Sequence, residues 1–180
     1  MKIFLFLAEG FEEIEAIAPI DVFRRADLNV TTVSTTSELV VYGAHQVGVQ
    51  ADILFEDADF SGDFLIYLPG GMPGTTNLDN HKGLKSLIEK QAAKGGKIAA
   101  ICAAPSILGK MGLLENKQAI CYPGFEDMLK GASISTSTIV ESENILTAKG
   151  PGVVIPFALK IVEKFKGSDL AEQIRSAMIL

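Results

Sequence analysis

Long apolar runs alternate along the chain with segments in which apolar residues recur at helical spacing. The runs KIFLFLA and DFLIYLPGG, residues 2–8 and 63–71, are almost continuously apolar, as buried parallel strands are. Apolar runs and helical spacing predict strands and helices along the whole chain. Strands are expected at 2–8, 29–34, 63–71, 97–101, 118–124 and 143–150, and helices at 12–26, 77–94, 104–112, 152–165 and 168–177.

Strands that alternate with helices predict an α/β fold, a doubly wound and mostly parallel sheet with helices on both faces. No linker, repeat or low-complexity tract interrupts the pattern, so we expect one domain over residues 1–180. Residues 38–57 alternate weakly around two glycines, which predicts a short β excursion at an edge. Pro19 lies inside the first helical segment, so that helix must start late or kink at the proline.

The composition is that of a globular protein, with 48% hydrophobic and 21% charged residues and a net charge of −6. A negative chain without a basic cluster has no electrostatic means of binding nucleic acid or an acidic membrane surface. No apolar stretch reaches the ~18 to 20 residues of a membrane span, and the N-terminal run meets carboxylates too early for a secretory signal. We therefore expect a cytoplasmic protein that binds neither nucleic acid nor membrane.

The chain contains two cysteines, Cys102 and Cys121, and two histidines, His45 and His81. Two cysteines at this spacing form no disulfide framework. The sequence has no CxxC motif and no histidine near either cysteine, so we expect no metal site.

Cys102 stands at the junction between the predicted strand 97–101 and the helix that follows. A sharp strand-to-helix turn projects its central residue outward, as in a nucleophile elbow, and it needs small neighbours, which alanines supply on both sides. The free N–H groups and partial positive charge at the N-terminus of the next helix favour a thiolate, so we expect a lowered pKa for Cys102. The alternative is a buried cysteine that packs as a small hydrophobe.

Two further loops follow predicted strands, and ligands bind at this edge of such sheets. In LPGGMPG, Gly70 and Gly71 allow backbone N–H groups to approach an oxyanion or a thiolate; the alternative is a tight turn. Glu15 falls on the inward stripe of the first helix, where burial keeps a carboxyl protonated with a raised pKa. Such a group donates a hydrogen bond to a thiolate or carries a proton. The alternative is a solvated acid on the helix face.

These pieces occur together and in order, and the sequence resembles the ThiJ/PfpI superfamily over essentially its whole length. More narrowly, it resembles the branch that contains the Parkinson's-disease-associated protein deglycase and its bacterial relatives. The stretches that carry the resemblance are EGFEEIEAIAPIDVFRRA, LPGGMPGTTNL, IAAICAAPSIL and AKGPGVVIPFALKIVE. The resemblance implies a flavodoxin-like fold, a homodimer and a chemistry that needs no cofactor and no metal.

The resemblance also implies roles for individual residues. Cys102 matches an oxidation-sensitive cysteine at the elbow, and Glu15 matches a protonated glutamate that hydrogen-bonds to it. Gly70, Gly71 and Ala103 match positions whose backbone N–H groups surround the family's pocket, and Gly150 and Pro151 match the loop beside it. His45 matches a polar or basic position near the dimer-related site.

The sequence departs from the family where several relatives place a histidine near the cysteine. This chain has Ala103 directly after the cysteine and Tyr122 on the later loop. Peptidase-like members depend on a Cys–His pair, so we expect no peptidase activity, and Glu15 would serve as the general acid or base. Tyr122 either donates a hydrogen bond to a substrate oxygen or packs as an aromatic. Cys121 is either an inert strand cysteine or a resolving thiol if Cys102 oxidises.

The residues and the family resemblance together imply two functions. The first is a glyoxalase- or deglycase-like enzyme, a lyase or hydrolase, in which Cys102 attacks a small aldehyde or glycated substrate to form a hemithioacetal and Glu15 moves protons. The second is a redox-sensing or stress-protective protein in which Cys102 oxidises to a sulfinate. Relatives are also labelled thiazole monophosphate biosynthesis proteins or intracellular peptidases, but the sequence has no Walker-type phosphate loop and no thiol–imidazole pair.

Overall fold

A seven-stranded sheet in the order β10-β11-β7-β6-β1-β2-β5 forms the centre of the computed structural model, which describes all 180 residues. Its strands are β1 (Lys2–Leu7), β2 (Asn29–Ser34), β5 (Ile53–Leu54), β6 (Phe64–Leu68), β7 (Lys97–Ile101), β10 (Ile139–Ser142) and β11 (Ile145–Ala148). Strand β10 pairs with β11 in antiparallel fashion, and every other neighbouring pair is parallel. The predicted mostly parallel α/β sheet is therefore confirmed.

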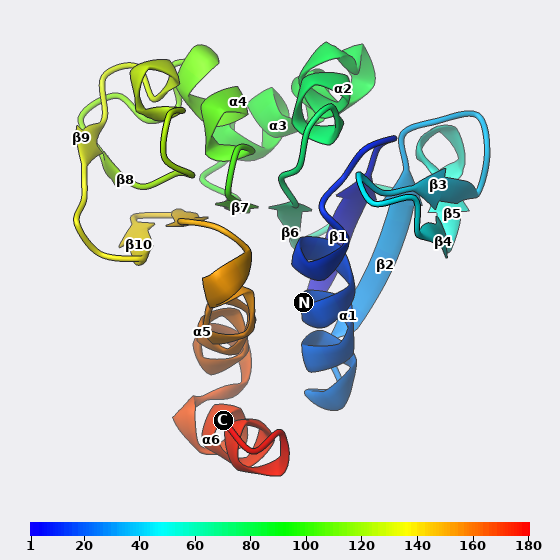
Figure 1. The fold of residues 1–180 in the computed structure, drawn as a ribbon, viewed down its shortest axis with the longest axis vertical. Helices are drawn as coiled ribbons and strands as arrows, with labels where there is room; N and C mark the ends of the chain where they lie inside the picture. The colour runs from blue at the N-terminus through cyan, green and yellow to red at the C-terminus, as the bar shows by residue number, and fades with distance from the viewer.

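Helices cover both faces of this sheet. They are α1 (Glu13–Arg25), α2 (Gly74–Asn80), α3 (Lys82–Ala93), α4 (Pro105–Lys110), α5 (Val154–Lys166) and α6 (Ser168–Ala177). One cluster of buried side chains joins the sheet to α1, α5 and α6, and a second joins it to α2, α3 and α4. Figure 1 shows this division, with α1 and α5 on one side of the strands labelled β6 and β7 and with α2, α3 and α4 on the other. None of the helices has both the length and the apolar character that a membrane-spanning helix needs.

The direction of the strands brings four loops together. Strands β1, β6 and β7 are buried along almost their whole length, which explains their apolar sequences. They pair side by side with the same direction, and β11 continues the series beyond β7. The segments that follow their carboxyl ends therefore meet at one edge of the sheet.

Helix α1 continues through Pro19 from Glu13 to Arg25. Proline has no N–H, so Pro19 cannot donate to the carbonyl four residues earlier, which belongs to Glu15. The hydroxyl of Tyr67, on β6, donates to that carbonyl at 3.1 Å. A contact with the sheet thus replaces the hydrogen bond that the proline removes.

The chain between β2 and β6 forms the predicted edge structure. Strands β3 (Val40–Tyr42) and β4 (Gly48–Gln50) make an antiparallel hairpin, and β5 joins the edge of the main sheet beside β2. The N–H of Gly10 donates to the carbonyl of Tyr42, and the N–H of Ala44 donates to the carbonyl of Phe11, both at 2.8 Å. The hairpin is therefore attached to the loop that precedes α1.

Two predicted elements differ from the structure. The helix expected over 77–94 is two helices, because His81 leaves the helical conformation and its Nδ1 accepts the N–H of Leu84 as the N-cap of α3. The strand expected over 118–124 is reduced to β8 (Gln118–Ala119), which pairs with β9 (Ser133–Ile134) outside the main sheet. The structure also has three short 3-10 helices, η1 (Phe55–Asp57), η2 (Glu126–Met128) and η3 (Pro151–Val153).

Candidate active site

Cys102 occupies the turn between β7 and α4. Its φ of 64° lies in the left-handed region that residues with side chains rarely adopt, so the surrounding structure must hold it there. The N–H of Cys102 donates to the carbonyl of Ala148 at 2.9 Å, and its carbonyl accepts the N–H of Tyr122 at 2.8 Å. The residue is only 9% exposed. The sulfur is therefore nearly enclosed and its backbone is held from two sides.

Glu15, in the first turn of α1, is completely buried. Its Oε2 accepts the N–H of Gly70 at 2.8 Å. Its other oxygen, Oε1, has no hydrogen-bond partner of regular geometry. The Cys102 thiol lies next to the carboxyl and interacts with it. Burial raises the pKa of Glu15 to about 7, although the Gly70 N–H and the thiol act to lower it. The expectation of a buried carboxyl with a raised pKa is confirmed.

The expectation of a lowered pKa for Cys102 is wrong. Burial raises the pKa of the thiol to about 12, and the charge of Glu15 and its hydrogen bond to the thiol add to the rise. The N–H groups of Gly71 and Ala103 act in the opposite direction but are outweighed. The contribution of the Glu15 charge disappears when Glu15 takes up a proton, so the two groups titrate as a coupled pair.

The backbone N–H groups of Gly70 and Gly71, which are consecutive residues, interact with Glu15 and with Cys102, respectively. The N–H of Gly70 serves the Glu15 carboxylate, and the N–H of Gly71 approaches the Cys102 sulfur. A Cβ on Gly70 would come within 2.7 Å of the Cys102 Cβ and 2.8 Å of Glu15 Oε2. Gly71 has a φ of 87°, and a Cβ there would collide with the backbone N of Glu12. Both positions therefore require glycine.

Tyr122, whose N–H donates to the Cys102 carbonyl, lies next to the loop at Gly150 and Pro151. Together with Pro123, Lys149, Gly152 and Val153 they line a cavity of about 320 Å³. A Cβ on Gly150 would come 3.1 Å from Cδ2 of the Tyr122 ring, so the ring faces this glycine. A larger cavity of about 650 Å³ lies between α5, α6 and β10, and none of the candidate residues lines it.

His45 is bound to α1 and is not among the groups that act on Cys102. Its Nδ1 lies 2.8 Å from Glu13 Oε2 and 3.8 Å from Glu12 Oε1, and its backbone N–H donates to Glu13 Oε1 at 2.7 Å. Burial acts to raise the pKa of Glu13, but these hydrogen bonds hold it below its usual value, and the same contact raises the pKa of His45.

Potential ligand atoms of Glu12, Glu13 and His45 lie within 4.8 Å of one another, a spacing that suits a metal ion. The carboxylate of Glu13 is already engaged by the His45 ring and by N–H groups of the hairpin. The cluster therefore acts as an ion pair that attaches the hairpin to α1.

The other cysteine and histidine are also separate from Cys102. Cys121 belongs to the core cluster on the α2–α4 face of the sheet, whereas Cys102 belongs to the cluster on the α1–α5 face. Cys121 follows β8 instead of lying in a strand, and burial raises its pKa to about 11. His81 caps α3. This placement favours an inert Cys121 over a resolving thiol.

Sequence reasoning missed Tyr67 and Glu13. The signal for Tyr67 was indirect, since a proline four residues after Glu15 leaves a carbonyl that needs a donor from elsewhere. The sequence had no signal for the burial of Glu13, because the hairpin that covers it is remote along the chain.

Residues 1–164 match the model of the DJ-1/PfpI family. The chain belongs to this family. It is 36% identical over 181 residues to "Protein DJ-1 homolog B" of Arabidopsis thaliana, an alignment that covers 99% of this chain and 41% of the plant protein. It is 31% identical over 173 residues to "Glutathione-independent glyoxalase DJR-1.2" of Caenorhabditis elegans, with 96% of this chain and 92% of that protein covered.

Among solved structures, "Toxoplasma gondii DJ-1, oxidized" superposes with a TM-score of 0.94 at 33% identity and covers 99% of this chain and 97% of that chain. This DJ-1/PfpI chain thus spans less than half of the plant relative but nearly all of the nematode and Toxoplasma proteins. The resemblance inferred from the motifs is confirmed.

Proposed function

We propose that this protein is a cysteine-dependent, cofactor-free enzyme that converts small 2-oxoaldehydes to hydroxy acids. The observation that carries the proposal is the buried pair of Cys102 and Glu15, in which the pKa of the carboxyl is about 7. The similarity to a relative named as a glutathione-independent glyoxalase supports the same reaction class. A deglycase activity on early glyoxal adducts would use the same residues.

The first step uses Glu15 as a general base. At neutral pH the pair consists of a thiol, whose pKa is about 12, and a carboxyl that is partly ionised. The Glu15 carboxylate takes the thiol proton while the sulfur bonds to the aldehyde carbon. It then gives this proton to the aldehyde oxygen, which yields a hemithioacetal and restores the Glu15 carboxylate. The reaction therefore needs no preformed thiolate.

The second step moves a proton between neighbouring carbons and needs no external oxidant. The Glu15 carboxylate removes the proton on the hemithioacetal carbon, which gives an enediolate. The proton returns to the former ketone carbon, and the hydroxyl proton moves from the former aldehyde oxygen to the former ketone oxygen. The aldehyde carbon is thereby oxidised to a thioester and the ketone carbon is reduced to an alcohol. Water cleaves the thioester, releases the hydroxy acid and restores the thiol. The N–H groups of Gly71 and Ala103 are donors for the negative charge that develops at the sulfur.

The second candidate function is a redox-sensing or stress-protective protein that uses the same cysteine. Peroxide transfers one oxygen to the sulfur at a time and leaves as water, so two transfers produce a sulfinate. The N–H groups of Gly71 and Ala103 and a protonated Glu15 surround the sulfur as donors. A related structure is described as oxidized. Burial raises the pKa of the thiol, so oxidation, like attack on an aldehyde, would need Glu15 to accept the thiol proton.

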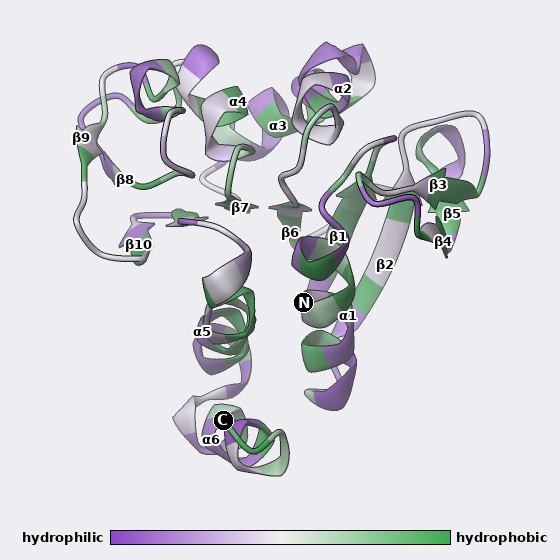
Figure 2. Cartoon of the chain, viewed as in Figure 1, coloured by the Kyte–Doolittle hydropathy of each residue, from purple (hydrophilic) through white to green (hydrophobic).

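We propose further that residues 1–180 form one domain and that two copies associate through α1 and the β3–β4 hairpin. Ile14 and Ile17 of α1 are 53% and 42% exposed, and three apolar side chains of the hairpin segment are 43% to 49% exposed. These three are Val40, Tyr42 and Val47. Figure 2 shows the hydrophobic colour on β3 and on turns of the neighbouring α1. Several exposed apolar side chains on two neighbouring elements are typical of an interface.

The proposed reaction is tested by methylglyoxal consumption with lactate detection. We expect Cys102→Ala to abolish turnover and Glu15→Gln to reduce it by about 100-fold or more, because each removes a reacting group. Cys121→Ala, on the opposite face of the sheet, should retain activity. Turnover should rise as the pH passes about 7, since Glu15 must be ionised to act as a base.

Lactate formation that is absent in the wild type, or equally fast in Cys102→Ala, would contradict the proposal. Mass spectrometry of Cys102 after mild peroxide would then test the redox function.

A further inference from the structure

The cavity between the two loops that hold the Cys102 backbone has an apolar lining and a single charge. Tyr122, Pro123, Pro151 and Val153 supply apolar surface, Gly150 and Gly152 leave the space open, and Lys149 contributes the charge. No carboxylate lines it. A cavity of about 320 Å³ with these walls suits a small ligand that has a flat, apolar body and one anionic group.

Lys149 is available to such a ligand. It is exposed and forms no ion pair with any carboxylate of the protein. In the larger cavity between α5 and α6, by contrast, Lys160 and Arg175 are paired with Glu163 and Glu172. In a chain with a net charge of −6, an unpaired cation in a cavity without acids produces a local positive potential that favours an anion.

The two loops that line the cavity also hold the backbone of Cys102. Tyr122, on one wall, donates its N–H to the Cys102 carbonyl at 2.8 Å. Ala148, which accepts the Cys102 N–H at 2.9 Å, directly precedes Lys149. A Cβ on Gly150 would approach the Tyr122 ring to 3.1 Å, so glycine keeps the space between these walls free. The positions of the cavity walls and of the reacting residue are therefore coupled.

We propose that this cavity is a substrate subsite in which Lys149 binds the carboxylate of a 2-oxoaldehyde whose aldehyde group reacts at Cys102. The inference rests on the proposed function and specifies its substrate class, namely carboxylate-bearing 2-oxoaldehydes in preference to neutral ones. Tyr122 and the two prolines contact the apolar body of the substrate. Lys149 sets specificity and takes no part in the proton transfers.

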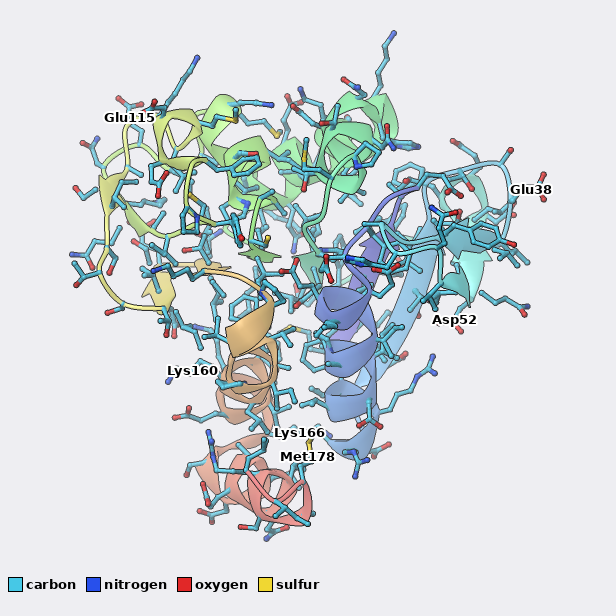
Figure 3. The ribbon with its side chains drawn as sticks, in the orientation of Figure 1. Glu38, Asp52, Glu115, Lys160, Lys166 and Met178 are labelled. Atoms are coloured by element: carbon cyan, nitrogen blue, oxygen red, sulfur yellow. The ribbon has the colours of Figure 1, made fainter.

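Phenylglyoxal and 4-carboxyphenylglyoxal, which differ only by a carboxylate, test this preference in initial-rate measurements. The carboxylate also changes the reactivity of the aldehyde, so the readout is the ratio of the two kcat/KM values in each variant. We expect Lys149→Met to lower the ratio of the carboxylated to the neutral substrate about fivefold, through the KM of the carboxylated substrate. Lys166→Met removes the same charge at the far end of α5 (Figure 3) and should leave the ratio as in the wild type.

Alkylation of Cys102 provides the same comparison without turnover. Iodoacetate and iodoacetamide each form a carbon–sulfur bond with loss of iodide, and they differ by one negative charge. We expect the ratio of their rates at Cys102, measured by mass spectrometry, to fall about fivefold in Lys149→Met and to fall in the wild type on addition of salt. A change in the pKa of Cys102 alters both rates alike and leaves the ratio unaffected.

The two measurements separate the possible failures. If the wild type turns over both aldehydes and Lys149→Met changes neither ratio, the subsite is overturned while the proposed function stands. If the wild type turns over neither aldehyde, the proposed function and the substrate assignment both fail. A Lys149-dependent alkylation ratio would then support the anion subsite alone, and an unchanged ratio would overturn it as well.

Discussion

Glu15 is a carboxyl group that is shielded completely from water and held by a single backbone N–H at Oε2. Burial favours its neutral form and brings its pKa to about 7, so acid and base forms coexist near neutral pH. The neighbouring Cys102 thiol, with a pKa of about 12, loses its proton only if a base accepts it. The reactivity that we propose therefore belongs to the pair, since neither group alone has a pKa suited to the whole reaction.

Glu15→Gln should change how stability depends on pH. Below pH 4.5 Glu15 is protonated in both the folded and the unfolded chain, and between 4.5 and about 7 only the unfolded chain ionises. The stability of the wild type should therefore fall as the pH rises through this window, by about 3 kcal/mol for the full shift. A glutamine side chain does not titrate, so urea unfolding of Glu15→Gln at pH 5 and pH 8 should lack this fall.

Glu89→Gln, which replaces an exposed carboxyl on α3, is the matched control and should retain the wild-type pH dependence. Parallel curves for the wild type and Glu15→Gln would mean that Glu15 ionises as easily in the folded protein as in the unfolded chain.

Helix α1 and strand β6 position Glu15 through one hydrogen bond. Pro19 leaves the Glu15 carbonyl without its helical donor, and Tyr67 supplies the donor from β6. Burial raises the pKa of Tyr67 well above its usual value, so its hydroxyl keeps its proton at every pH of interest. The first turn of the helix is thus held to the strand whose end carries Gly70 and Gly71.

Tyr67→Phe should destabilise the fold by about 1 to 3 kcal/mol, because it leaves a buried carbonyl without a donor at almost constant volume. Urea unfolding measures the loss, and Tyr42→Phe, which removes an exposed hydroxyl from the β3–β4 hairpin, should cost much less. A Tyr67→Phe variant as stable as the wild type would show that water or a shift of the helix satisfies the carbonyl.

The molecule presents apolar side chains of α1 and the β3–β4 hairpin on a surface that the Glu13–His45 contact joins together. Ile17→Glu would place a charge in the centre of the proposed interface and should convert a dimer to a monomer in sedimentation-velocity experiments, because burial of an unpaired charge is costly. Ile179→Glu, at a 94% exposed position near the C-terminus, should leave the oligomeric state unchanged. A wild-type protein that sediments as a monomer would contradict the proposed interface.

The local pattern of the chain was sufficient to predict most of the architecture. Continuous apolar runs identified β1, β6 and β7, because strands buried on both faces tolerate few polar residues. Helical spacing identified α1, α5 and α6, and the position of Cys102 between a strand and a helix followed from the order of elements. The split at His81 and the short β8 escaped prediction, because a side-chain cap and a missing strand partner are not visible in apolar periodicity.

The amino-acid order alone thus specified the fold class and the family motifs, since both are written in residue type and spacing, and the resemblance carried by those motifs implied the pairing of Cys102 with Glu15. The folded arrangement specified the pKa values and the neighbours of these groups. The pKa of Cys102 rises because desolvation and the Glu15 charge exceed the effect of two N–H groups, and these contributions depend on distances across separate strands. The same holds for the Tyr67 contact and the His45–Glu13 pair, which bring together residues far apart in the chain.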